Sequence, residues 1–255
     1  MDKCKHKGLA EELTGFLMKL NEGKSDNRIR QEANRLISHI TPKDIARAEQ
    51  RLARNGLPLK KIQQLSAAFV LMGILDGNEE NLRARLAPHH ILRKVMAEHE
   101  MMRCFLADLE DVALQIQHAE RLSATSREFM RLTHIVEHLN SIQEHIDRED
   151  DVLFPVLKNE GWKSLFEHIE SEHVHILLSI NDLVKLVMAF DQMPFATFKT
   201  RLMSTVRYLC PLMQEHLFRE DRALFPLAVS MVTDDKVWSH LRKVCDEIDY
   251  CGIHV

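Results

Sequence analysis

Four long stretches of the chain repeat apolar residues every three to four positions from Pro88 onward. They cover roughly 88–118, 125–155, 162–190 and 194–230, and a shorter stretch covers 235–248. This spacing is typical of a helix with one apolar face. A helix of about 28 residues is about 42 Å long, at about 1.5 Å per residue. Because the connections between the stretches are short, the pattern predicts an up-down-up-down four-helix bundle.

The first 80 residues show shorter periodic segments with clear ends. Thr41 and Pro42 predict the start of a helix that stops at Gly56, and Pro58 opens the next one. The polar segment GILDGNEEN, residues 73–81, is turn-like and is the best candidate for a domain boundary. We therefore expect an all-α protein in which a small N-terminal helical domain, residues 1–80, precedes a bundle domain, residues 85–255.

Composition supports helices and excludes several classes of partner. The 255 residues include only 8 Gly and 7 Pro, about half of the roughly 12% that average usage supplies, so folds rich in tight turns are nearly excluded. A net charge of −4 offers no basic surface for nucleic acid. No apolar run of about 18 residues predicts a membrane span, and the start MDKCKHKGLAEEL has no apolar core of a signal peptide. Five irregularly spaced Cys argue against a disulfide framework and favour a reducing, cytoplasmic setting.

Histidine is the unusual residue, and its positions repeat. The chain has 15 His, as many as all its Phe, Tyr and Trp together, and twelve of them fall between His89 and His240. The second long stretch contains HIDREDDVLFP from residue 145, and the fourth contains HLFREDRALFP from residue 216. The first and third contain Glu98-His99 and Glu172-His173, which precede those segments by 46 and 43 residues from His to His. The bundle is therefore predicted to contain two copies of one helical hairpin.

The repeated residues have the pattern of a metal site. Side chains four residues apart lie above one another on a helix, so each HxxxE segment presents an imidazole and a carboxylate to one point. All of these residues lie on otherwise apolar faces, where burial without compensation costs several kcal/mol for each group. A bound metal compensates this cost, and six ligands at one level suit two metals better than one, with the two glutamates able to bridge. The candidate ligands are His99, His145, Glu149, His173, His216 and Glu220.

Alternatives remain at the level of sequence. The same residues could form a hydrogen-bonded polar layer, or the histidines could face solvent. Asp150 and Asp221 could replace the neighbouring glutamates as ligands, although helical phase favours the glutamates. Cys104 and Cys210 fall off the ligand face, and Cys245 and Cys251 read as plain thiols rather than as a redox pair. Cys4 and His6 near the start read as part of a tail rather than as a metal site.

These motifs carry a family resemblance. Residues 89–230 resemble a hemerythrin-like, HHE cation-binding domain, on the evidence of the two Glu-His pairs and the two histidine–carboxylate segments. The resemblance implies that the six residues bind two non-haem irons, with Glu149 and Glu220 as bridges. It also implies binding of O2 or NO, or a role in iron sensing or in repair of damaged iron sites. Residues 9–80 resemble a domain of unknown function often found ahead of such domains.

The chain departs from the oxygen-carrying members of this family. Those members have a second histidine on the third helix, four residues after the first, and here that position is Leu177. Reversible O2 storage is therefore not expected. In members with the same N-terminal domain, a histidine near the start of the first helix is part of the pattern, and His90 matches it. Nine residues separate His90 from His99, half a turn out of phase, so His90 could bind a metal or support a ligand.

We therefore expect a di-iron protein that binds or senses a small oxidant: O2, NO or peroxide. The N-terminal domain would pass the signal on, and an electron-donor or signalling protein would be the macromolecular partner. The alternatives are an iron-dependent reductase or peroxidase, and a protein that repairs damaged iron–sulfur clusters. No Gly-rich loop for a flavin or nicotinamide occurs in the chain, so a reductase would take its electrons from a partner.

Overall fold

All regular secondary structure in the described part of the chain is helical. The structure is a computed structural model that describes residues 2–23, 27–75, 82–160 and 162–248. Within these residues no strand occurs, which confirms the predicted all-α class. The first helices are α1 (Asp2–Asn21), α2 (Asn27–Ile37), α3 (Pro42–Arg54), α4 (Leu59–Leu75) and α5 (Leu82–Arg85). The later ones are α6 (Ile91–His118), α7 (Arg127–Asn140), α8 (Ile142–Asp147), α9 (Phe154–Glu160), α10 (Lys163–Met188), α11 (Phe195–Arg219), α12 (Phe225–Met231) and α13 (Asp235–Cys245).

Three short segments of other helical types complete the chain. The π-helix η1 (Arg148–Leu153) joins α8 to α9, and the π-helix η3 (Glu220–Leu224) joins α11 to α12. A 3-10 turn, η2 (Phe190–Gln192), precedes α11. The predicted stretches 125–155 and 194–230 thus correspond to two nearly continuous helical runs, each with one π-helical segment, a feature that periodicity alone did not predict.

By their packing, the residues form two compact units. The N-terminal unit comprises residues 1–82, 154–171 and 219–233, and the bundle unit comprises residues 83–153, 172–218 and 234–255. The division passes between η1 and α9, through α10 between Ser171 and Glu172, and near the end of α11 between Phe218 and Arg219. The expected boundary segment 73–81 falls largely on residues 76–81, outside the described residues. A division into domains at residues 80–85 stays a prediction.

In the N-terminal unit, α1 packs on α3 and α2 packs on α4. Thr41 and Asp44 form a capping box at the start of α3, which confirms the helix start read from the sequence. The rings of Phe16 and Phe69 meet edge to face, with centroids 5.3 Å apart, in the core of this unit. Gly73 allows the close approach of α4 to α2, because a Cβ there would lie 2.8 Å from the Cβ of Ile37.

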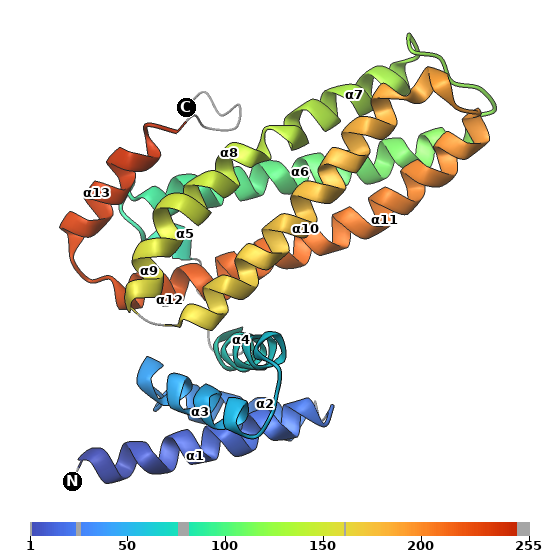
Figure 1. Cartoon of the computed structure of the whole chain (residues 1–255). Helices are drawn as coiled ribbons and strands as arrows, with labels where there is room; N and C mark the ends of the chain where they lie inside the picture. The colour runs from blue at the N-terminus through green and yellow to red at the C-terminus, as the bar shows by residue number, and fades with distance from the viewer. Residues whose placement is uncertain (1, 24–26, 76–81, 161, 249–255) are drawn as a thin grey trace. The chain divides into compact units, whose positions relative to one another are not determined.

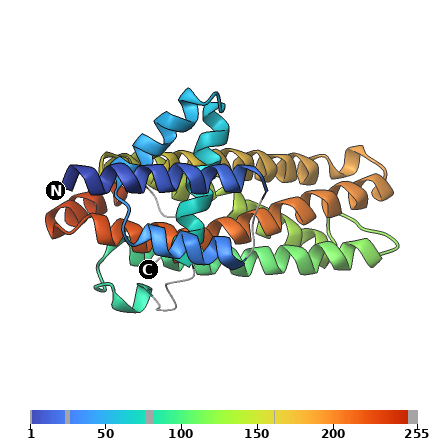
Figure 2. The same ribbon diagram turned by 90° about the horizontal axis from the view of Figure 1, so that it is seen from below.

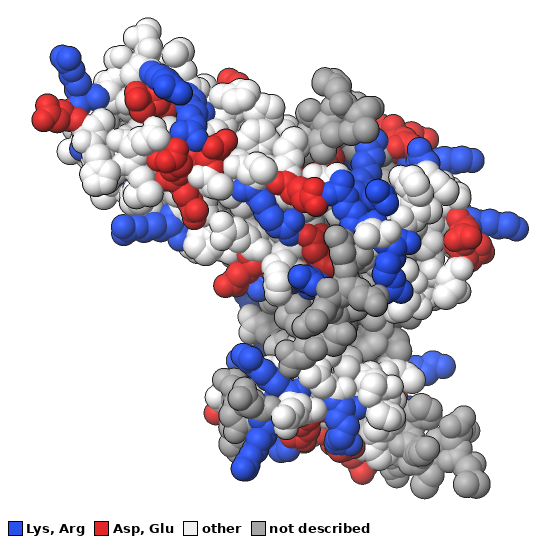
Figure 3. All heavy atoms as spheres, turned by 180° about the vertical axis from the view of Figure 1, so that it is seen from behind, with Lys and Arg blue, Asp and Glu red and all other residues white. Residues whose placement is uncertain are grey.

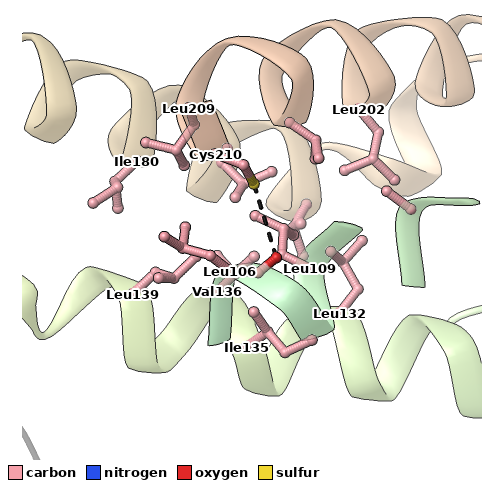
Figure 4. Packing of buried hydrophobic residues seen from close by; sticks show 14 of the residues in the cluster. Leu106, Leu109, Leu132, Ile135, Val136, Leu139, Ile180, Leu202, Leu209 and Cys210 are labelled. Carbon is pink, nitrogen blue, oxygen red and sulfur yellow. Dashed lines mark hydrogen bonds between the residues drawn. The ribbon is translucent and has the colours of Figure 1, made fainter. Parts of the chain in front are cut away.

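The bundle unit has one apolar core along its length. In the two views of Figures 1 and 2, the long helices α6, α7, α10 and α11 run beside one another. Leucine, isoleucine and valine side chains from all of them form a single buried cluster. Figure 4 shows part of this cluster, in which the thiol of Cys210 lies 3.9 Å from the backbone oxygen of Leu106. The polar residues of the repeated motifs adjoin this cluster, since His145 lies between its members Ile142 and Ile146, and His216 between Met213 and Leu217.

Charges of both signs are mixed on the surface. On the face drawn in Figure 3, Lys and Arg side chains alternate with Asp and Glu, and neither sign gathers into one large patch. Exposed ion pairs such as Arg131 with Asp108 and Asp111 tie α7 to α6. Such surface pairs contribute little to stability, so burial of the apolar cluster holds the bundle together.

A truncation in the apolar cluster tests whether its burial stabilises the bundle. Leu109 on α6 is fully buried in the cluster, and Leu109→Ala is expected to lower the free energy of unfolding by about 2–5 kcal/mol, because it leaves a cavity. Leu114 lies on the same helix but is half exposed, and Leu114→Ala should change it by less than about 0.5 kcal/mol. Urea unfolding followed by circular dichroism measures both, and equal losses would contradict the assigned core.

Candidate metal centre

The six candidate ligands all lie in buried positions on the four long helical runs. His99 is on α6 and His173 is on α10. His145 and His216 lie in the last turns of α8 and α11, and Glu149 and Glu220 lie at the starts of η1 and η3. All six are buried, in a part of the chain whose other buried side chains are mostly apolar. The alternative of solvent-facing histidines is therefore wrong for these four positions.

Both glutamates occupy π-helical segments, and each segment leads into a proline. Pro155 and Pro226 follow in the first turn of α9 and α12. A proline donates no backbone hydrogen bond and clashes with the preceding turn, but it is tolerated in the first turn of a helix. In both runs the π-helical segment ends and a new α-helix begins one residue before the proline, so the proline stands in the first turn, where a helix tolerates it. Wide π-helical turns are frequent at functional sites.

The histidines meet in two pairs, one in each half of the repeat. The Nε2 atoms of His99 and His145 lie 3.1 Å apart, and those of His173 and His216 are also 3.1 Å apart. One carboxylate oxygen of Glu149, Oε2, lies 3.5 Å from Nε2 of His145 and 3.4 Å from Nε2 of His173. Glu149 therefore reaches both pairs.

Two overlapping groups of possible ligand atoms result. One group is His99, His145, Glu149 and Glu220, and the other is Glu149, His173, His216 and Glu220; within each group the ligand atoms all lie within 4.8 Å of one another. Each group thus has two histidines of its own, and both share the same two glutamates. This is the arrangement expected where carboxylates bridge two ions.

The surroundings of Glu149 fit a cation. Both of its carboxylate oxygens are buried, and neither has a hydrogen-bond partner among the described residues. Burying a carboxylate without a hydrogen bond or a counter-charge is costly, and its nearest nitrogen contacts are too long for normal hydrogen bonds. A metal ion bound by the histidine nitrogens supplies the missing positive charge, so the residues present fit a metal.

Three further carboxylates orient the histidines. Nδ1 of His145 lies 2.7 Å from Glu98, Nδ1 of His216 lies 3.0 Å from Glu172, and Nδ1 of His173 lies 2.8 Å from Asp150. An imidazole that donates its Nδ1–H to a carboxylate has its lone pair on Nε2, the atom that faces the centre here. Metal-binding histidines almost always have such a partner.

The sequence showed the two Glu-His pairs but not which side chain each glutamate contacts. In each half, the glutamate beside the first histidine accepts a hydrogen bond from the histidine of the following helical run, not from its neighbour. Asp150, which the sequence left open as an alternative ligand, has its Oδ1 2.8 Å from Nδ1 of His173. Neither Asp150 nor Asp221 belongs to the two groups of ligand atoms. Only the packing of the helices decides which histidine each carboxylate meets.

Arg148 is a residue that sequence reasoning missed. Its side chain is fully buried, and one guanidinium nitrogen donates to both carboxylate oxygens of Glu98, at 2.5 and 2.6 Å. Burial alone raises the pKa of Glu98, but the hydrogen bond and charge of His145, together with Arg148, outweigh burial and hold the pKa below its ordinary value. Glu98 therefore stays an ionised acceptor.

His90 lies at the helix start rather than in either group. Its Nδ1 accepts a hydrogen bond from the backbone N–H of Leu92, at 3.2 Å, which caps α6. Its ring packs on Trp238, with centroids 4.6 Å apart, and burial, with the nearby His89, lowers its pKa. The geometry gives His90 a role as a helix cap, and whether it also binds a metal stays a prediction.

The remaining histidines and cysteines stand apart from the two groups. His138 stacks on Phe105 and contacts the exposed His134. Cys104 is exposed, whereas Cys210 and Cys245 are buried, and burial raises the pKa of their thiols to about 12 and about 11. Those two therefore stay protonated near neutral pH and are poor metal ligands. The side chains of Cys4, His6 and Cys251 lie outside the described residues.

Comparison with known families agrees with this geometry. The sequence profile of the hemerythrin HHE cation binding domain matches residues 90–228, more than half of the chain. The chain therefore belongs to the hemerythrin HHE family and is a metal-binding helical protein. A family of unknown function, DUF438, matches residues 13–68. Both resemblances expected from the sequence are thus confirmed. No curated protein matches the chain. Among the described helices, none is long and apolar enough to cross a membrane.

Histidine variants test the centre. His145→Ala removes a buried imidazole whose Nε2 lies 3.1 Å from Nε2 of His99 and 3.5 Å from Oε2 of Glu149. The variant is expected to bind at most half as much metal per chain. His138→Ala, seven residues earlier, should leave metal content unchanged, because His138 belongs to neither group. Elemental analysis of reconstituted chains measures both, and equal metal content in the two variants would contradict the site.

Proposed function

We propose that the chain binds two irons at this centre and that the centre responds to a small oxidant: O2, NO or peroxide. The observation that carries the proposal is the pair of histidine groups that share two buried glutamates. Each iron would have two histidines, one pair being His99 and His145 and the other His173 and His216, with Glu149 and Glu220 between them. Mixed histidine and carboxylate sites with open positions suit non-haem iron that takes a small exogenous ligand.

The protein's own residues would hold and insulate the centre. Iron held by these residues would supply a redox-active Lewis acid. The carboxylates of Glu98, Glu172 and Asp150 keep the Nδ1 protons of three histidines in place, so that their Nε2 lone pairs stay aimed inward. The buried apolar cluster along the bundle would limit the access of water to the centre.

Sensing is favoured over storage by a contact within the N-terminal unit. Helix α4 packs on η3, the π-helical segment that begins with Glu220. Other contacts in this unit are hydrogen bonds from Ser164 to Glu49, at 2.6 Å, and from Gln63 to Glu167, at 2.7 Å. A shift of Glu220 on ligand binding would therefore reach α4 directly. We propose that the N-terminal helices pass this change to a signalling partner.

Iron loading tests the metal part of the proposal. After anaerobic loading with Fe(II), the chain is expected to retain two irons, and its absorption spectrum should change on addition of O2 or NO. The double variant His145→Ala/His216→Ala should bind neither iron stably and show no spectral change, because one donor of each group is lost. Retention of one metal or none by the unmodified chain, or two irons with a spectrum indifferent to O2 and NO, would contradict the proposal.

Limited proteolysis tests the sensing part. The rate of cleavage within residues 1–80 is expected to differ between the Fe(II) protein and the protein exposed to O2 or NO, because α4 contacts the segment that carries Glu220. Mass spectrometry assigns the fragments, and metal-free protein given the same gases is the control. Identical cleavage in all states would rule out sensing through these helices and leave only a binding protein.

A further inference from the structure

The two histidine pairs have equivalent ligands but different surroundings. At the pair His99–His145, the carboxylate that holds His145 is Glu98, whose side chain is 0% exposed. At the pair His173–His216, the carboxylates are Asp150, 30% exposed, and Glu172, 12% exposed. The internal repeat therefore gives two similar ligand sets, one with a dry supporting carboxylate and one with supporting carboxylates that reach water.

The dry side is fixed by a buried ion pair. Both oxygens of Glu98 accept hydrogen bonds from Arg148, which is itself fully buried, while Oε2 also accepts from His145. The carboxylate plane is thus held from two sides, and the ring of His145 is held through it. Charge-assisted hydrogen bonds of this kind are strong where water cannot compete.

Helix α13 packs over this side of the bundle unit. It contacts both η1, which contains Arg148 and Glu149, and α6, which contains Glu98. The side chain of Cys245, at the end of α13, is fully buried, and Arg148, Glu149 and Glu98 all influence the pKa of its thiol. At the edge of the same helix, Asp246 lies 3.8 Å from Lys94 of α6. This cover explains why the ion pair is dry.

At the pair His173–His216, the supporting carboxylates are not fully shielded from water. Water reaches the side chain of Asp150, so it competes for the hydrogen bond that holds the ring of His173. Glu172, which holds His216, is also partly exposed. A histidine whose orienting hydrogen bond exchanges with water leaves its metal more readily, because the ring is free to rotate when that bond opens.

We propose that Glu98 and Arg148 are positioning residues that make the His99–His145 metal the retained one, and that the metal at His173–His216 exchanges first. This inference rests on the proposed binding of two metals. It assigns each half of the repeat a different task. One half holds its metal more tightly, and the other half is where metal enters and leaves first.

The test is the kinetics of metal release from the full chain. Anaerobic protein loaded with Fe(II) is mixed with excess of a chromogenic iron(II) chelator, and the absorbance of the chelate is followed. The unmodified chain is expected to release one iron quickly and one slowly. His173→Ala should retain mainly the slow iron and His99→Ala mainly the fast one, which assigns the two phases to the two pairs.

The repeat supplies matched variants. Glu98→Gln should accelerate the slow phase about 10- to 100-fold and leave the fast phase unchanged, whereas Glu172→Gln should accelerate only the fast phase. Arg148→Lys keeps the positive charge and should leave the rate of the slow phase largely unchanged, whereas Arg148→Met should increase it. Because Glu98→Gln leaves a buried guanidinium without its carboxylate, the double variant Glu98→Gln/Arg148→Met tests the same point without an unpaired charge. Thermal unfolding of each metal-free variant shows whether it folds.

The outcomes separate this inference from the proposed function. Two irons released in one phase by the unmodified chain, or equal acceleration of both phases by Glu98→Gln and Glu172→Gln, would overturn the inference while leaving a two-iron centre. A chain that takes up no iron would overturn the proposed function as well. Two phases that respond separately to the two glutamine variants would establish two inequivalent metal positions.

Discussion

Two glutamates buried in a helical bundle, facing four histidine nitrogens, are the constraint on which the rest of the structure depends. Glu149 and Glu220 have no exposed surface, and a carboxylate in such a place is stable only beside a positive charge or several donors. The bundle meets this condition by bringing four histidines close to the two glutamates: His99, His145, His173 and His216. A cation completes the charge balance, and for this reason the centre reads as a metal site rather than as a polar layer.

The supporting residues show how such a centre is kept in shape. Three of the histidines are held at Nδ1 by a carboxylate from another helical segment, so the helices are tied together through the ligands themselves. Arg148 extends this network into the protein by holding Glu98. Buried ion pairs are weak evidence for stability, but they fix orientation, and orientation is what a ligand histidine needs.

Both central glutamates lie in π-helical segments, and one of these segments, η3, contacts the N-terminal helix α4. Each segment begins near a HxxxE motif and ends before Phe-Pro, so the proline that limits the helix also fixes the turn that carries the glutamate. Because α4 packs on η3, a part of the chain with no candidate ligands touches the segment that contains Glu220. The residues that match DUF438, a family of unknown function, include the first part of α4.

The sequence by itself determined the helical class, the starts of α3 and α4, the twofold repeat and the identity of the six candidate ligands. Those features depend on local rules: apolar spacing, capping residues, proline and glycine, and side chains four residues apart on one helix. It also showed the two Glu-His pairs, but it could not say that Glu98 serves His145 and Glu172 serves His216.

Only the tertiary structure decided these partners, because they join helices more than 40 residues apart in the chain. The burial of Arg148 and the unequal exposure of Asp150 and Glu98 belong to the same class of property. Each depends on which helices pack together and where water is excluded. Periodicity along the chain carries no information on either.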